Sequence, residues 1–244
     1  YSFYENDSLD DTSNILREWL ADRKGILLTE KRNHPKWESV PSTSRTEAMA
    51  QYRNSCLYSL RDKKYDYLFI IDSDIYYDED LFKSMINLLD NNKMYGMITP
   101  NTQQNVSDKF DLNESTSYYD SWALKDLQGN QGLSFAYNPF IMINDRSKWD
   151  EFLPISVASA FGGISIVRGN LLQEEKLMWN GDFGCEHWYF CEKIREMNYL
   201  IVVHPLLLTE VRHVNPVRPD IFLLIFDKLR LMQTTFKNNN FDHR

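Results

Sequence analysis

Cysteine is scarce in this chain of 244 residues, which contains only Cys56, Cys185 and Cys191. These three have no zinc-ligand spacing and cannot all pair with one another, so we expect reduced, small core residues. Positive charge is also in short supply, because 27 Lys and Arg face 35 Asp and Glu for a net charge of −8. Binding to a phosphate backbone needs clustered basic residues, so this balance argues against a nucleic-acid partner.

Long apolar runs are absent as well. No stretch of about 18 apolar residues occurs, so no transmembrane segment is predicted, and no signal peptide is visible. The chain opens without Met, which leaves an upstream leader or anchor open. Asn-x-Ser sequons at Asn6, Asn105 and Asn113 favour a secretory compartment, whereas the few cysteines favour the cytoplasm. We therefore expect either the cytoplasm or the Golgi lumen, with a preference for the cytoplasm.

The residues that are present suit one large α/β domain. With 43% hydrophobic residues the chain can bury a full core, whereas two separate domains would be cramped. Short apolar strands alternate with amphipathic helices over the first hundred residues, which predicts βαβ units and a mostly parallel sheet flanked by helices. We expect strands at 2–4, 25–29, 67–71, 97–100, 160–167, 200–203 and 206–213, and helices near 13–20, 45–60, 78–89, 185–197 and 219–236.

Two segments depart from this alternation. Residues 101–152 are polar and aromatic without a sustained period, and so long a loop in a compact domain is usually functional or mobile. The segment 219–236 reads as an amphipathic helix with apolar residues in register at Ile221, Leu224, Ile225, Leu229 and Met232. We expect this apolar face to pack against the domain; contact with a membrane surface is the alternative.

The most informative stretch is YDYLFIIDSD at residues 65–74. Its apolar run, 67–71, predicts a strand buried on both faces, and the run ends in Asp72 and Asp74. Ligands of open α/β sheets bind outside the carboxyl ends of the strands, and carboxylates there suit Mg²⁺ or Mn²⁺ with positions left for phosphate oxygens. A turn or capping role for the two acids is the alternative.

Several motifs occur together in one order along the chain: ENDSLDDT after an early strand, SRTEAMAQYRN on the helix before the acidic strand, DSD, and a late acidic helix followed by a strand and a histidine. This order resembles the nucleotide-sugar glycosyltransferases of the GT-A fold, from Tyr4 to about His213. YYDSW at 118–122, KDLQG at 125–129 and CEHWYFC at 185–191 resemble, more narrowly, the fungal capsule-type α-mannosyltransferases. There is also a likeness to fungal Golgi mannan-polymerase subunits.

The resemblance implies a single GT-A domain over 1–218, with a nucleotide-sugar half at 1–100 and an acceptor half at 101–218, and a C-terminal helix and tail at 219–244. The first strand of such a fold is absent from this sequence. The resemblance also implies that Asp74 ligates Mn²⁺ or Mg²⁺, that Asp72 contacts the ribose or, through water, the metal, and that His213 supplies a third ligand. His204 is the competing histidine.

For the nucleotide-sugar donor, the resemblance implies contacts from residues after the first strand and from glycines and polar residues near the acidic motif: Tyr4, Glu5, Asn6, Asp7, Ser73, Gly162, Gly163 and Trp122. An Asx turn is the alternative for the residues after the first strand. Arg45 and Arg53 lie about two turns apart on one helix and are assigned to the diphosphate, although Arg53 pairing with a carboxylate is an open alternative.

Glu186 is the candidate for acceptor activation or for binding sugar hydroxyls, and Asp72 is counted with it as catalytic. A carboxylate at this place acts as general base in an inverting enzyme, whereas in a retaining one it orients the donor; the resemblance leans towards retaining. A residue stabilising the helix N-terminus is the alternative. Tyr119, Asp120 and Trp122 are candidates for sugar contacts or for packing.

The sequence thus predicts a metal-dependent glycosyltransferase that moves a hexose, with mannose as first choice, from a nucleoside diphosphate sugar to a glycan hydroxyl. Two alternatives stay open. One is a metal-dependent phosphohydrolase or nucleotidyltransferase, and the other is an inactive glycan-binding subunit of the same fold.

Overall fold

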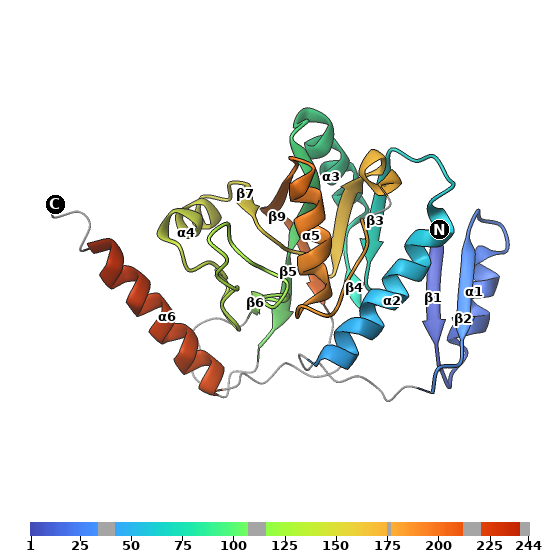
Figure 1. Cartoon of the computed structure of the whole chain (residues 1–244), viewed down its shortest axis with the longest axis horizontal. Helices are drawn as coiled ribbons and strands as arrows, with labels where there is room; N and C mark the ends of the chain where they lie inside the picture. Colours follow the sequence, from blue (N-terminus) through green and yellow to red (C-terminus); the bar gives the residue numbers. More distant parts are fainter. Residues whose placement is uncertain (34–41, 107–115, 175–176, 212–220, 240–244) are drawn as a thin grey trace. The chain divides into compact units, whose positions relative to one another are not determined.

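The computed structural model describes residues 1–33, 42–106, 116–174, 177–211 and 221–239. The chain divides into two compact units: unit 1 comprises Tyr1–Asp66 and Gly169–Lys193, and unit 2 comprises Tyr67–Arg168 and Ile194–Arg244. Figure 1 labels the helices and strands. The expected domain boundary at 218 falls outside the described residues, so the predicted division at 218 stays a prediction.

Unit 1 is built around two parallel strands, β1 (Ser2–Asn6) and β2 (Ile26–Glu30), joined through helix α1 (Thr12–Leu20). The long helix α2 (Thr43–Leu60) and the short 3₁₀ helix η2 (Gly169–Gln173) belong to the same unit. Helix α5 (Glu186–Glu196) begins in unit 1 and ends in unit 2. In α2, Ser42 accepts a hydrogen bond from the N–H of Arg45 and so caps the helix.

Unit 2 contains a seven-stranded sheet in the order β3-β8-β5-β9-β4, with β6 on β5 and β7 on β9. Its strands are β3 (Tyr67–Ile71), β4 (Ile75–Tyr76), β5 (Tyr95–Asn105), β6 (Thr116–Tyr118), β7 (Ile155–Val157), β8 (Ile164–Arg168) and β9 (Leu200–Val211). The mixed α/β class with helices around a sheet is confirmed. The expectation of mostly parallel pairing is wrong, because in this sheet β5 and β9 pair in parallel and the other pairs are antiparallel.

The connections explain these directions. The turn 72–74 between β3 and β4 is too short for a crossover, and parallel strands need a dozen or more connecting residues. Strand β8 starts opposite the end of β3, with Ile71 and Ile164 in register, so the chain enters β8 at the edge where β3 ends. Strand β8 therefore runs antiparallel to β3.

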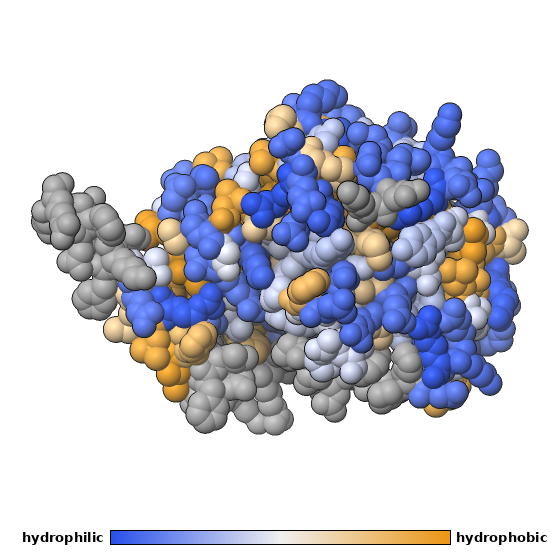
Figure 2. Space-filling view, viewed as in Figure 1, coloured by the Kyte–Doolittle hydropathy of each residue, from blue (hydrophilic) through white to orange (hydrophobic). Residues whose placement is uncertain are grey.

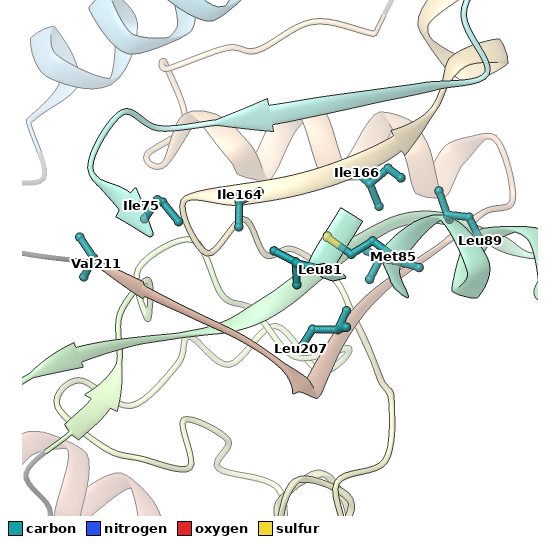
Figure 3. Close-up of a cluster of buried hydrophobic side chains, with 9 residues drawn as sticks. Ile75, Leu81, Met85, Leu89, Ile164, Ile166, Leu207 and Val211 are labelled. Atoms are coloured by element: carbon teal, nitrogen blue, oxygen red, sulfur yellow. The ribbon is translucent and has the colours of Figure 1, made fainter. Parts of the chain in front are cut away.

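The core of unit 2 lies between helix α3 (Glu79–Asn91) and the sheet. Leu81, Met85 and Leu89 are spaced four residues apart, as expected for one helix face. Figure 3 shows them near residues of three strands, Ile75, Ile164, Ile166, Leu207 and Val211. Ile98 of β5 belongs to the same cluster. Because Ile75 directly follows the DSD motif, this core anchors the motif's C-terminal side.

The remaining parts of unit 2 differ from the sequence expectations. Residues 101–152 are not one structureless loop, because they include the end of β5, strand β6 and helix α4 (Ile143–Asp150). Strand β9 is continuous where two strands were expected. No helix among the described residues is long and apolar enough to cross a membrane.

Helix α6 (Ile221–Asn239) confirms the predicted C-terminal helix but not its packing. Ile225, Leu229 and Met232 are exposed, and Figure 2 shows hydrophobic side chains over part of α6. A polar contact joins the described part of α6 to the rest of unit 2: the carboxylate of Asp227 is buried and accepts a 2.7 Å hydrogen bond from the N–H of Ser134. The expectation that this apolar face packs inward is therefore wrong for these three residues.

Candidate functional site

In unit 2, the DSD motif forms the turn that follows β3. The N–H of Asp72 donates a 2.8 Å hydrogen bond to the carbonyl oxygen of Gly163, which fixes the start of the turn. Asp72 is half-buried, and Ser73 and Asp74 are exposed. The motif thus combines a fixed backbone with carboxylates that solvent can reach.

Strand direction brings further polar residues to the same edge. Strands β3 and β5 both pair antiparallel with β8, and β9 runs parallel to β5, so all three point the same way. Their carboxyl ends therefore share one edge of the sheet, where ligands of α/β folds bind. Besides the DSD motif, this edge carries Gln103, Asn105 and Glu210.

Gly162 and Gly163 position the acidic turn. Both have positive φ angles, 67° and 71°, which favour glycine. A Cβ atom added to Gly163 would lie 2.4 Å from Cδ1 of Ile75, so the close approach of these two segments requires a glycine. The N–H of Gly162 donates a 3.0 Å hydrogen bond to Oδ2 of Asp120. The glycine pair therefore links Asp120 to the backbone of Asp72, and its assignment to the donor site stays a prediction.

Two further residues of unit 2, Tyr119 and Trp122, were assigned to sugar contacts, and both lie within two residues of Asp120 in the sequence. Tyr119 donates its backbone N–H to the carbonyl oxygen of Thr102 at 2.8 Å. Trp122 lies in the turn that starts at Asp120, where the N–H of Leu124 donates to the Asp120 carbonyl oxygen. Trp122 is half-buried, and its sugar-binding role stays a prediction.

A pocket of about 590 Å³ opens at this edge of the sheet. Its lining residues come from β4, β5, β6, β9 and the start of α3: Tyr76, Tyr77, Asp78, Gln103, Asn105, Thr116, Leu208, Thr209 and Glu210. Sequence reasoning assigned none of them to a binding site, and it named Asn105 only as a sequon. The signal that it passed over is the aromatic pair Tyr76-Tyr77 directly after the DSD strand.

The donor set of the DSD motif fits a hard divalent cation. Mg²⁺-type ions are usually held by one or two carboxylates plus substrate phosphates and water, not by a closed protein cage. Asp72 and Asp74 supply two such carboxylates. Among the described residues no group of three or more His, Cys, Asp or Glu is placed to hold a metal ion, and His213 lies outside them.

His204, the competing histidine, has another role in the structure. Its Nδ1 accepts a 3.3 Å hydrogen bond from the N–H of Leu206, within the continuous strand β9. Burial lowers the pKa of His204 below its usual value, so its ring is neutral at pH 7.

In unit 1, the last residues of β1 and those that follow it form a hydrogen-bonded turn. Glu5 is buried; burial alone would raise its pKa, but hydrogen bonds from Ser8 and Ser13 outweigh that effect and lower the pKa. Asn6 Nδ2 donates to Asp7 at 3.0 Å. Asp7 has φ of 60° and accepts 3.0 Å hydrogen bonds from two backbone N–H groups after β2, those of Arg32 and Asn33. The carboxylates of Glu5 and Asp7 thus stabilise this turn, and their donor contacts stay a prediction.

Tyr4 forms an aromatic platform in the same unit. Its ring stacks on that of Tyr52, with centroids 4.6 Å apart. The guanidinium of Arg32 lies 5.7 Å from the Tyr4 ring and 5.3 Å from the Tyr52 ring. The Tyr4 hydroxyl donates a 2.9 Å hydrogen bond to Glu30, and burial together with this carboxylate raises the Tyr4 pKa.

Arg53 and Glu186 form a buried ion pair, although they are 133 residues apart in the sequence. Arg53 Nη1 lies 3.0 Å from Oε1 of Glu186, and Glu186 is 4% exposed at the first residue of α5. The open alternative that Arg53 pairs with a carboxylate therefore matches the structure. A buried, paired carboxylate does not reach an acceptor hydroxyl in this conformation, so the general-base role of Glu186 stays a prediction.

His187 joins this pair, and sequence reasoning gave it no role. Its Nδ1 accepts a 3.2 Å hydrogen bond from the indole N–H of Trp179, so in the neutral ring the proton is assigned to Nε2, which lies 3.6 Å from Oε1 of Glu186. Burial, and then the positive charges of Arg53 and Arg45, hold the pKa of His187 well below its usual value. Arg45 is half-buried near the start of α2.

All three cysteines are free, as expected: Cys56 is half-buried, and Cys185 and Cys191 are buried. Burial, the largest influence, raises the pKa of the Cys56 thiol. Cys185 Sγ lies 3.8 Å from Oε2 of Glu186, next to the ion pair of unit 1.

The sequence is similar to a known protein family and to one known enzyme. A family model described as Cryptococcal mannosyltransferase 1 matches residues 1–195. Procollagen galactosyltransferase 1-B of Xenopus laevis is 28% identical over 141 residues, which are 54% of this chain and 21% of that protein.

Among solved structures, that of GalNAc-T7 with UDP, GalNAc and Mn²⁺ aligns with a TM-score of 0.53 at 9% identity, over 95% of this chain and 41% of that chain. Mannosyltransferase PcManGT from Pyrobaculum calidifontis, in complex with GDP-Man and Mn²⁺, aligns with a TM-score of 0.46 at 13% identity, over 100% of this chain and 55% of that chain.

The chain therefore spans less than half of the length of procollagen galactosyltransferase 1-B and of GalNAc-T7. The structural likeness concerns the fold, and the family match covers most of the chain. Both agree with the resemblance inferred from the sequence motifs. The chain has the GT-A fold and belongs to the family described as Cryptococcal mannosyltransferase 1.

Proposed function

We propose that the chain is a metal-dependent glycosyltransferase that moves a hexose from a nucleoside diphosphate sugar to a hydroxyl group of a glycan. The observation that carries the proposal is the DSD turn at the carboxyl end of β3, where the backbone of Asp72 is fixed by Gly163 and Asp74 is open to solvent. Family membership and the GT-A fold support it.

The chemistry of such a transfer explains why acids are needed there. A diphosphate leaving group accumulates negative charge as its bond to the anomeric carbon breaks, and a divalent cation held by Asp72 and Asp74 would neutralise that charge. The hydrogen bond from the Asp72 N–H to Gly163 holds the backbone of the turn in place before substrate arrives. Asp72 is proposed to contact the ribose or the metal through water, and Asp74 to ligate the metal directly.

The residues of unit 1 are proposed to serve the nucleotide and the transfer step. Tyr4 of β1 and Tyr52 of α2 form a stacked pair, and Tyr4 directly precedes Glu5, Asn6 and Asp7, where the resemblance places the base contacts. Arg53 holds Glu186, and we propose that Glu186 acts by orienting groups in the site, in line with a retaining reaction. A hexose donor with mannose as first choice follows the family, whose model is described as a mannosyltransferase.

The test is calorimetry with GDP-mannose, UDP-galactose and UDP-GalNAc, each with Mn²⁺ and with EDTA in its place. We expect one donor to bind with Mn²⁺ and to lose most of its affinity with EDTA. Asp74→Asn should abolish the metal-dependent part, whereas Asp62→Asn, which changes an exposed carboxylate in a turn after α2, should leave it intact. Unchanged Mn²⁺-dependent affinity in folded Asp74→Asn would contradict the metal assignment.

Product analysis separates the alternative reactions. A glycosyltransferase releases the nucleoside diphosphate and transfers or hydrolyses the sugar, whereas a phosphohydrolase or nucleotidyltransferase cleaves between phosphates and releases a sugar phosphate. Release of the sugar phosphate by the wild-type chain would overturn the proposal. Metal-dependent donor binding with neither product would identify an inactive binding subunit.

A further inference from the structure

The pocket at the carboxyl edge of the sheet has the residue chemistry of a carbohydrate site. The polar side chains that line it are carboxylates, amides and hydroxyls, and the described lining residues include two acids and no Lys or Arg. A diphosphate would be repelled there, whereas neutral hydroxyl groups find both hydrogen-bond donors and acceptors. Its volume of about 590 Å³ lies in the usual range for small-molecule sites.

Strand register places three of these side chains in one row. Tyr76 pairs with Glu210 across β4 and β9, and Glu210 pairs with Gln103 across β9 and β5. Directly paired residues point to the same face of a sheet, so these three side chains share a face. Asn105 and Leu208 lie two residues away from members of the row and so point to the same side. The row thus combines an aromatic ring, a carboxylate, two amides and an apolar side chain.

Two of the residues that line the pocket are tyrosines. Tyr76 and Tyr77 are 52% and 42% exposed, so solvent and ligands can reach both rings. The Tyr77 ring is held edge-on by Phe82 of α3, with centroids 4.8 Å apart, and Phe82 packs in turn against Phe69 of β3 at 4.5 Å. Tyr77 is therefore an exposed ring in a fixed position, which suits stacking on the apolar face of a sugar.

The amides complete the site. Within the described part of the chain, the side chains of Gln103 and Asn105 form no hydrogen bond to protein. Both lie at the end of β5, where the strand reaches solvent. An amide offers two donors and an acceptor, which matches the paired hydroxyl groups of a pyranose ring.

We propose that this pocket binds a pyranose ring of the glycan acceptor. The inference rests on the proposed function, because it needs a donor at the DSD motif. Tyr76 follows Asp74 by two residues, so their Cα atoms are at most about 7 Å apart, which places a sugar in the pocket beside the diphosphate site. The two carboxylates among the described lining residues disfavour a diphosphate in the pocket itself, and the exposed tyrosines are open to a sugar that arrives from solvent.

The test uses methyl α-mannopyranoside and methyl β-galactopyranoside as acceptor probes, with binding measured by saturation-transfer NMR and without nucleotide. Tyr77→Ala and Gln103→Ala should each weaken binding of the glycoside that the wild-type chain recognises, by about fivefold for the tyrosine, since one stacked ring contributes on the order of 1 kcal/mol. Tyr58→Ala is the matched control, because Tyr58 is a 48% exposed tyrosine on α2 of unit 1. Thermal unfolding checks that each variant is folded.

Calorimetry with the donor and Mn²⁺ then separates acceptor from donor. Unchanged donor affinity in Tyr77→Ala, together with lost glycoside binding, supports the acceptor assignment. Equal loss of donor affinity would mean that the pocket holds the donor sugar and would overturn it. Glycoside binding that survives both substitutions, or that is absent from the wild-type chain for both probes, would also overturn it. Because the glycoside arm contains no nucleotide, its outcome is independent of whether the proposed donor chemistry is correct.

Discussion

Replacing Glu186 by Gln removes one charge of the buried pair with Arg53. The two side chains are 5% and 14% exposed, so water screens them little, and their contact is 3.0 Å. Removing one partner of a buried ion pair costs about 3–5 kcal/mol, because the other charge stays buried without a counter-charge. For a chain of this size we expect the melting temperature to fall by about 6–20 °C.

The assay is thermal and urea unfolding of a double-mutant cycle with Glu186→Gln, Arg53→Met and the double variant. The double variant contains neither charge, so it should regain part of the stability that each single variant loses. Lys83→Gln is the control, since Lys83 pairs with Asp80 on the solvent-exposed face of α3 at 2.8 Å, where water screens the pair. A melting temperature of Glu186→Gln no lower than that of the control would refute the reasoning about burial.

The same protein samples measure the chemical role of Glu186. If its carboxylate acts as general base, turnover of Glu186→Gln falls by roughly 10²–10⁴-fold while donor affinity is kept. If the residue only stabilises the start of α5 and the Arg53 pair, stability falls and turnover per folded molecule stays near normal. Wild-type turnover in the folded variant would remove Glu186 from the mechanism.

Three further predictions concern other contacts. Gly163→Ala should lower stability by about 1–3 kcal/mol more than Gly129→Ala in thermal unfolding, because both have positive φ but only the first meets Ile75 at 2.4 Å; equal losses would contradict the close approach. The pKa of His187 is depressed in the folded chain, so the unfolded chain binds the extra proton first, and stability should fall as pH drops below about 6.5, by up to 1.4 kcal/mol per pH unit. His187→Gln should remove this slope in urea titrations at several pH values, and an unchanged slope would assign it to other groups. Asp227→Asn should weaken the charge-assisted hydrogen bond to the 131–134 segment and speed amide hydrogen exchange in α6; unchanged exchange would show that other contacts hold the helix.

Local sequence signals predicted the elements that lie around the DSD motif. The apolar run before Asp72 forms β3 with the predicted bounds, but the expected burial on both faces is wrong, because β3 lies at the edge of the sheet and Ile71 is exposed. The helix expected near 78–89 is α3, and Leu81, Met85 and Leu89 are its buried residues. Both signals succeed because strand and helix periodicity depend on neighbours within a few residues. The position of the two acids at a strand end follows from the same local pattern.

Interactions between distant segments were beyond these signals. The directions of β4 and β8 depend on which strands they pair with, and a strand's own sequence does not encode its partner. The inward face expected for α6 is wrong for the same reason, since Asp227 is buried whereas Ile225 and Leu229 are exposed. An amphipathic pattern shows that a helix has two faces, and only packing decides which one is covered.

By itself, the sequence determined the α/β class, the family resemblance and the acidic turn after β3, because each of these is written in short, contiguous motifs. Only the tertiary structure decided that Arg53 is bound to Glu186, that Gly162 and Gly163 connect Asp120 with Asp72, and that Tyr76, Glu210 and Gln103 form one row. The physical reason is that ion pairs, close backbone approaches and cross-strand rows join residues tens to more than a hundred positions apart. Their geometry exists only once the strands have paired and the core beneath them has packed.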